Sequence, residues 1–285
     1  MIKHLNKIIK IVKNCNFIEI IFLVLRKIKL IRYNSFVEKR KLQLEQEVIL
    51  LTKKKVINGF YKGIQLNCKS NWGIGDYSSK LLGIYEFQVQ NKIIELQKRY
   101  KLKYLINFGS ADGYHLIGLI KNNFFESAFA YEINDNERLN LQENLNLNNI
   151  VEKVEIFSNA NFQQIQDNFN DEKLKKTLYL VDIEGAEFDL FNQDNLTQFN
   201  KSIIIIENHD FFIKNKIKID TFFKLLKENF HLEVLHDCQR NPHNIIEIQE
   251  YKDDDKWLMV SEGRICKQDW LICIPKSRYL KTSSI

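Results

Sequence analysis

Proline and glycine are scarce in this sequence, with only 2 prolines and 10 glycines among 285 residues. Collagen-like and low-complexity chains need far more of both, so these classes are excluded. Each of the few glycines therefore marks a position with a special backbone requirement. Hydrophobic residues make up 45% of the chain, which favours a folded protein with a sizeable core over a disordered one.

Paired cysteines and long apolar runs are also missing. The five cysteines are odd in number and contain no Cys-x-x-Cys pair, so neither a disulfide framework nor a zinc knuckle is expected. The longest apolar run, residues 17–25, contains Glu19 and is followed by Arg26 and Lys27. It is too short to span a membrane and lacks a small-residue cleavage site. These features indicate an uncleaved chain in a reducing, cytoplasmic compartment.

Positive charge is concentrated at the start of the chain. Residues 1–55 carry 14 Lys and Arg against 4 Asp and Glu, whereas the remaining residues carry 28 against 32. A nucleic-acid partner would require a basic surface on the main domain, so none is expected. Apolar residues and lysines recur at helical spacing over residues 1–32. This pattern predicts an amphipathic helix that either contacts an anionic membrane surface peripherally or packs against protein.

A second helix is predicted after this segment. Ser35, with Glu38 three residues later, has the form of a capping box, and the helix is expected to run to about residue 51. Residues 1–58 are therefore predicted to form a basic helical N-terminal extension. The main domain is predicted to cover residues 59–285.

Strands and helices alternate in the main domain. Residues 56–78 are expected to be strand and loop, and a helix is expected over residues 85–100. Strands are then predicted at 103–108, 127–133, 153–157, 177–182, 202–207 and 231–236. Helices are predicted at 114–122, 136–147, 161–168, 187–192 and 217–229. This order predicts an α/β fold with a mostly parallel sheet, helices on both faces, and ligands at the carboxyl ends of the strands.

The first predicted strand ends in a loop, residues 107–113, that contains two glycines. Gly109 and Gly113 permit a sharp turn and a close approach of the backbone to a ligand. A dinucleotide fingerprint would also need glycine where Ala111 and Tyr114 stand, so the loop fits the looser pattern of methyltransferases. The predicted cofactor-binding residues of this loop are Asn107, Gly109, Ala111, Asp112 and Gly113.

The next two strands end in further candidates for cofactor binding. Glu132 closes an apolar strand about 20 residues beyond the glycine loop, where a carboxylate can accept hydrogen bonds from ribose hydroxyls. Asn159, at the end of the third strand, is a candidate for an adenine contact or alternatively a helix N-cap.

Acidic residues and a histidine follow the fourth and fifth strands. Asp182 and Glu184 come after one apolar strand, and Glu207 and His209 after the next. Adjacent parallel strands would point these four side chains into one crevice. Several titratable groups in one cleft are what proton transfer or metal binding requires. We therefore predict that Asp182, Glu184, Glu207 and His209 are catalytic.

The sequence Asp-Ile-Glu-Gly-Ala-Glu at residues 182–187 resembles the hallmark of the FkbM-type methyltransferase family. The loop at residues 107–114 and the segments 82–86 and 206–210 also match the pattern of that family. Glu262-Gly263-Arg264 and Trp270 resemble a C-terminal element of some relatives. The resemblance covers about residues 59–275. Asn107 departs from it, because relatives carry an acid there, and so does Ala111.

The resemblance implies a Rossmann-like class I methyltransferase fold with a seven-stranded sheet. It also implies the cofactor S-adenosyl-L-methionine, with Glu86 and Asp182 joining the cofactor site. The expected reaction is methylation of a hydroxyl on a sugar, glycolipid or other small metabolite, with His209 or Asp182 as the base. The acceptor pocket is expected to involve residues 56–80 and 238–268.

Several alternatives remain open. Asp182, Glu207 and Asn208 stand where related enzymes carry magnesium ligands, so magnesium is possible but not expected. Residues 253–255, three aspartates, resemble the metal-binding acids of some glycosyltransferases, although a solvated turn is favoured. A membrane-associated binding module with a methyltransferase-like fold is a further alternative. The oligomeric state is not predicted.

Overall fold

The computed structural model describes residues 36–69, 73–160, 162–236, 240–264, 266 and 268–282. The predicted amphipathic helix of residues 1–32 lies outside these residues, as do Cys15 and Cys238. Within the described part of the chain, no helix has the length and apolar character needed to cross a membrane.

A seven-stranded sheet forms the centre of the described structure, in the order β3-β2-β1-β4-β5-β7-β6. The strands are β1 (Tyr104–Phe108), β2 (Ser127–Tyr131), β3 (Val154–Phe157), β4 (Thr177–Val181), β5 (Ile203–Glu207), β6 (Phe230–Leu235) and β7 (Trp270–Pro275). The pairs among β1 to β5 are parallel, and β7 runs antiparallel to β5 and β6. The sheet is mostly parallel and has seven strands, so the predicted Rossmann-like α/β fold is confirmed.

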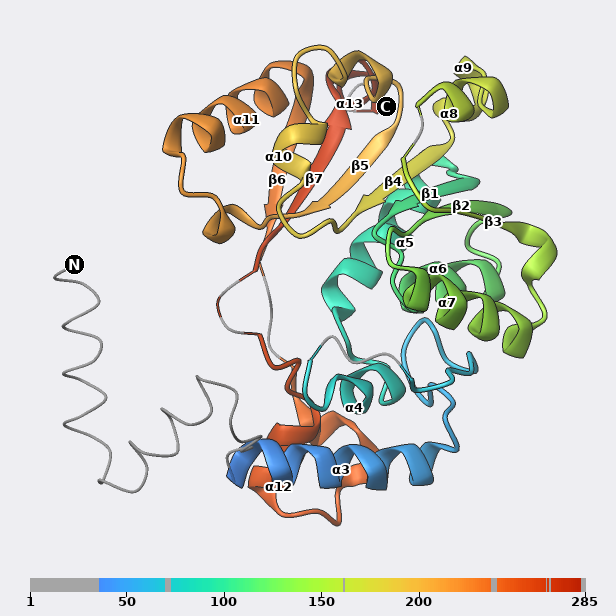
Figure 1. The fold of residues 1–285 in the computed structure, drawn as a ribbon, viewed down its shortest axis with the longest axis vertical. Coiled ribbons are helices and arrows are strands. Elements are labelled where there is room, and N and C mark those ends of the chain that lie inside the picture. The colour runs from blue at the N-terminus through green and yellow to red at the C-terminus, as the bar shows by residue number, and fades with distance from the viewer. Residues whose placement is uncertain are drawn as a thin grey trace, which may run out of the picture.

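Helices cover both faces of the sheet (Figure 1). The α-helices are α3 (Phe36–Thr52), α4 (Asp76–Leu81), α5 (Phe87–Tyr100), α6 (Tyr114–Lys121), α7 (Asp135–Asn148), α8 (Phe162–Asn168), α9 (Asp171–Leu174), α10 (Glu187–Leu190), α11 (Lys216–Asn229), α12 (Asp253–Met259) and α13 (Lys276–Thr282). Short 3-10 helices are η1 (Val151–Lys153), η2 (Leu196–Gln198), η3 (Asp210–Phe212), η4 (Pro242–Asn244) and η5 (Ile246–Ile248). Helices α3, α4 and α12 pack together at one end of the molecule (Figure 1).

Two apolar clusters lie on opposite faces of the sheet. Successive side chains of a strand point to opposite faces, so Leu178 and Leu180 of β4 join one cluster and Tyr179 and Val181 join the other. Because both faces are covered, the strands read as continuous apolar runs. This burial holds the carboxyl ends of the strands in a fixed arrangement.

Helix α3 contributes to the first of these clusters. Leu44 and Val48 are fully buried in it, because the helix turns these two side chains toward α4. The described part of the predicted N-terminal extension therefore packs onto the main domain. The boundary at residue 58 stays a prediction.

Three segments differ from the predicted elements. Residues 56–78 are expected from the sequence to be strand and loop. Their described residues, 56–69 and 73–78, are mostly turns and loop, with one isolated bridge between Lys55 and Gln65, and the last of them begin α4. The predicted pattern locates six strands but not β7, whose six apolar residues do not distinguish a strand from a buried helix. Asp253 to Asp255 form the first turn of α12 rather than a solvated turn.

Candidate functional site

A cavity of about 330 Å³ lies at the carboxyl ends of the central strands. This volume is in the range of small-molecule sites, which begin at about 300 Å³. Most of the predicted site residues line it: Glu86, Asn107, Gly109, Ala111, Asp112, Glu132, Asp182, Glu184 and Glu207. The fold therefore brings together candidates that are far apart in the sequence.

Four predicted residues are not part of this lining. Gly113 precedes α6 in a left-handed conformation, and Asn159 has an exposed side chain. Asn208 follows the last residue of β5 and does not line the cavity. His209 is fully buried and contacts Asp182 and Glu207 in the wall of the cavity.

The glycine loop meets the end of β4 so closely that position 109 has no room for a side chain. A Cβ atom on Gly109 would lie 1.6 Å from the backbone oxygen of Asp182, and the φ angle of Gly109 is +74°. Ala111, two residues later, also has a positive φ of 46°. The sharp turn expected from the sequence is present, and it places the loop against the carboxyl end of β4.

Glu132 connects the glycine loop to the end of β2. Its Oε2 accepts the backbone N–H of Ala111 at 2.9 Å, and its Oε1 accepts that of Asn134 at 2.8 Å. Each carboxylate oxygen has a second lone pair that can accept a further hydrogen bond. The side chain is buried and lines the cavity, so it is held in place for a ligand hydroxyl.

Asp112 has structural partners that the sequence does not reveal. Its Oδ2 lies 2.9 Å from Lys80 Nζ, and it also accepts the hydroxyl of Tyr77 at 3.3 Å. Burial alone would lower the pKa of Lys80, but Asp112 and Asp76 raise it overall. The buried Lys80–Asp112 pair therefore fixes α4 against the glycine loop.

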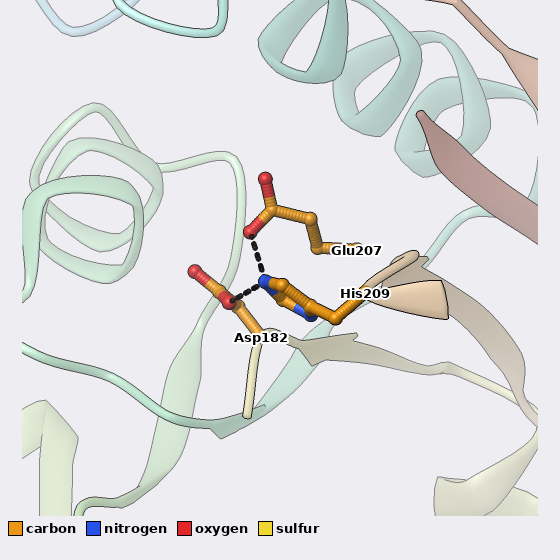
Figure 2. A group of neighbouring side chains, drawn as sticks. All are labelled: Asp182, Glu207 and His209. Carbon is orange, nitrogen blue, oxygen red and sulfur yellow. Dashed lines mark ion pairs between the residues drawn. The ribbon is translucent and has the colours of Figure 1, made fainter. Parts of the chain in front are cut away.

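Asp182, Glu207 and His209 form a tight group at the ends of β4 and β5 (Figure 2). His209 Nε2 lies 3.3 Å from Glu207 Oε2 and 3.6 Å from Asp182 Oδ1. Glu184 is a more distant and half-exposed neighbour, with Oε2 at 3.7 Å from the same nitrogen. The predicted crevice of titratable groups is thus present in the described structure.

Glu187 holds His209 from the other side. Its Oε1 accepts the backbone N–H of His209 at 3.0 Å and lies 3.1 Å from Nδ1, and its Oε2 accepts the backbone N–H of Gly185 at 2.9 Å. Burial alone would lower the pKa of His209, but Glu187 and the carboxylates opposite raise it to about 11. Glu187 is absent from the predicted site, although it is the last acid of the hexapeptide at 182–187.

The two carboxyl groups of this cluster differ in acidity. Burial and the neighbouring Glu207 raise the pKa of Asp182 well above its usual range. Burial would raise the pKa of Glu207 too, but His209 and the charge of Arg264 lower it to about 2. Glu207 is therefore an anion at neutral pH, whereas Asp182 holds a proton more tightly than an ordinary carboxyl group.

Arg264 closes one side of the cavity. It pairs with Glu86 and Glu207, and its Nε donates to Glu262 at 2.7 Å. Burial alone would lower its pKa, but the surrounding carboxylates raise it. In the sequence, only the family resemblance at residues 262–264 indicates a role for Arg264. The residue belongs to no periodic apolar pattern and follows no predicted strand.

A second cavity of about 350 Å³ shares Arg264 and Trp270 with the first. Its other walls include Asn58, Phe87 and Asn244. Asn58 and Asn244 come from the two segments expected to build an acceptor pocket, residues 56–80 and 238–268, whereas Phe87 begins α5. Arg264 thus stands between the two cavities.

The aspartates of α12 are not part of either cavity. Both carboxylate oxygens of Asp255 accept from the guanidinium of Arg40, at 2.8 and 2.7 Å. This pair joins α12 to α3. A glycosyltransferase-type metal site at these aspartates has no support in this geometry.

No family model matches the sequence, and no curated protein matches it. Among solved structures, a putative O-methyltransferase from Klebsiella pneumoniae aligns with 12% identity and a TM-score of 0.45, over 88% of this chain and 94% of that chain. An O-methyltransferase from Bacillus cereus in complex with SAH aligns with 12% identity and a TM-score of 0.47, over 87% and 94%. A precorrin-6y C5,15-methyltransferase from Geobacter metallireducens aligns with 12% identity and a TM-score of 0.41, over 65% and 86%. Similarities at this level concern the fold and not the substrate.

Proposed function

We propose that this protein is an S-adenosylmethionine-dependent methyltransferase of the FkbM type that methylates a hydroxyl oxygen. The observation that carries the proposal is the convergence of Glu132, the glycine loop and Asp182 on one cavity at the strand ends. Ligands bind at this edge in open α/β sheets. The acceptor we propose is a saccharide or another small hydroxylated metabolite.

The residues of the cavity fit this cofactor. Ser110 Oγ is buried in the cavity wall and has no hydrogen-bond partner among the described residues. Glu132 offers lone pairs suited to ribose hydroxyls. Eight acidic side chains line the cavity but only two Lys or Arg. This charge balance favours a ligand with a positive sulfonium and ammonium group.

The chain's own residues would orient the acceptor and remove its proton. S-adenosylmethionine, when bound, supplies a methyl group that its sulfonium already activates. Asp182 is the group we assign as the base, because its carboxyl group lines the cavity at the end of β4, within reach of an acceptor hydroxyl. His209 keeps its proton near neutral pH and holds Asp182 in place. Alignment in such a site can contribute about 7–11 kcal/mol.

The second cavity is the place we propose for the acceptor. It opens beside Trp270 and Phe87, and the amides of Asn58 and Asn244 lie in its wall. Aromatic faces next to amide groups suit the apolar face and the hydroxyls of a sugar ring. Arg264 separates this cavity from Asp182 and Glu207, so its side chain would have to move for transfer.

A product assay tests the proposed function. Purified protein is incubated with S-adenosylmethionine labelled in the methyl group, and with sugars, glycolipids and phenolic acceptors in turn. We expect a labelled O-methyl product that disappears with Asp182→Asn but persists with Glu155→Gln, a change on the exposed edge strand β3. If folded protein binds the cofactor but yields no methylated product, the proposed activity is wrong and the protein only binds the cofactor.

A further inference from the structure

A divalent metal ion fits between Asp182, Glu207 and His209. One ligand atom from each residue lies within 4.8 Å of the others in the described structure. Two ligands at about 2.1 Å from one ion can lie up to about 4.2 Å apart. The separations of 3.3 and 3.6 Å at His209 Nε2 are within that limit. Figure 2 shows both carboxylates directed at this nitrogen.

The orientation of His209 gives independent support. Glu187 can only accept hydrogen bonds, so the Nδ1 that faces it at 3.1 Å carries the proton. A divalent ion would displace the other ring proton, because a ligating imidazole is neutral, and the lone pair of Nε2 would then face the carboxylates of Asp182 and Glu207. Nε2 is buried, and no described residue forms a hydrogen bond with it. With that proton displaced, three lone pairs would face one point, which suits a bound cation.

The contacts around this group match those of metal-ligating histidines. Such histidines donate the other ring N–H to a carboxylate, which fixes the ring and raises its basicity as a ligand. Glu187 provides this contact at His209. Glu207 is fixed in a similar way, because Arg264 binds its Oε1 while Oε2 faces the histidine.

We propose that Asp182, Glu207 and His209 bind one divalent transition-metal ion of the manganese-to-zinc type. One imidazole with two carboxylates suits these ions better than Mg²⁺, which prefers oxygen ligands and retains several waters. The site differs from the alternative magnesium set of Asp182, Glu207 and Asn208, because His209 takes the place of Asn208. Three protein ligands leave coordination positions open toward the cavity.

The catalytic use of this ion rests on the proposed function, whereas its binding does not. A hydroxyl at an open position would have a lowered pKa. Its proton would pass to water, because Asp182 would then be a ligand and could not act as the base. The ion therefore offers a second way to activate the acceptor oxygen.

Metal binding can be measured on the full chain without any cofactor. Chelator-treated protein is titrated with Mn²⁺, and free Mn²⁺ is followed by its electron paramagnetic resonance signal. We expect one saturable site per chain, from which Zn²⁺ but not an equal concentration of Mg²⁺ displaces the ion. Failure of saturable binding by folded protein would overturn the proposal.

Two matched variants distinguish a specific metal site from nonspecific attraction of Mn²⁺ to acidic side chains. Asp182→Asn removes a ligand, and Glu184→Gln removes an equal charge whose oxygen lies 3.7 Å from the same nitrogen. We expect Asp182→Asn to weaken Mn²⁺ binding at least about tenfold and Glu184→Gln to weaken it much less. Equal losses in both variants would overturn the site. A parallel titration with S-adenosylmethionine tests the proposed function separately, because either ligand can bind without the other.

Discussion

The substitution Glu187→Gln should destabilise the protein strongly, although it changes one atom. The Glu187 carboxylate is fully buried and accepts three N–H groups, two from His209 and one from Gly185. A glutamine has one oxygen, and its NH₂ group only donates. Either orientation of the amide therefore sets its NH₂ group against at least one N–H donor.

The size of the effect follows from these contacts. A buried donor without an acceptor costs about 1–3 kcal/mol, and breaking a buried ion pair by removing one partner costs about 3–5 kcal/mol. The two estimates overlap at about 3 kcal/mol, which we take as the expected loss in the free energy of unfolding. A loss of this size exceeds the effect of an ordinary surface change about sixfold.

Urea denaturation of chelator-treated protein measures this loss. The control is Glu184→Gln, which removes the same charge from a half-exposed side chain and should change stability by less than about 0.5 kcal/mol. If Glu187→Gln also changes stability by less than about 0.5 kcal/mol, the contacts of Glu187 do not support His209 as described.

Three further predictions concern other parts of the molecule. Burial and Asp76 raise the pKa of Glu45 from 4.5 to about 6. The contribution of protonated Glu45 to stability is therefore present below pH 4.5 and lost as the pH rises through 6. In urea denaturation, Glu45→Gln should be about 2 kcal/mol more stable than the wild type at pH 8 and equal to it at pH 4. Leu44→Ala should cost about 2–5 kcal/mol in the same assay, whereas Leu50→Ala, at a side chain that is 77% exposed, should cost less than about 0.5 kcal/mol. Gly109→Ala should weaken S-adenosylmethionine binding at least about tenfold in calorimetry, because the new Cβ would force the glycine loop away from β4; unchanged affinity would show that the loop does not contact the cofactor.

Most of the fold could be predicted from the sequence because the strands are buried on both faces. An apolar run such as that of β4 followed by a helix allows few arrangements other than a parallel sheet. Strand β7 could not be placed in this way, since it pairs antiparallel with two strands that precede it in the chain. Its position depends on the chain between β6 and β7, which has no regular pattern.

The site could be predicted in part for a related reason. Asp182 and Glu207 follow adjacent strands, so the sheet alone brings them together. The hydrogen-bond partners of Asp112 and Glu187 depend on side-chain contacts, and the spacing of residues in the sequence does not reveal these contacts. Asp112, expected to bind the cofactor, lines the cavity and is also paired with Lys80. Glu187 faces His209 because of the turn at Gly185.

Calorimetric titration of the full chain with S-adenosylmethionine tests the central claim most directly. Glu132→Ala is titrated in parallel, because Glu132 lines the cavity and holds the loop at Ala111. We predict saturable binding by the wild-type protein and a loss of at least about tenfold in affinity in the variant. Folded wild-type protein that binds neither S-adenosylmethionine nor its demethylated product would contradict the assignment of the cavity as a cofactor site.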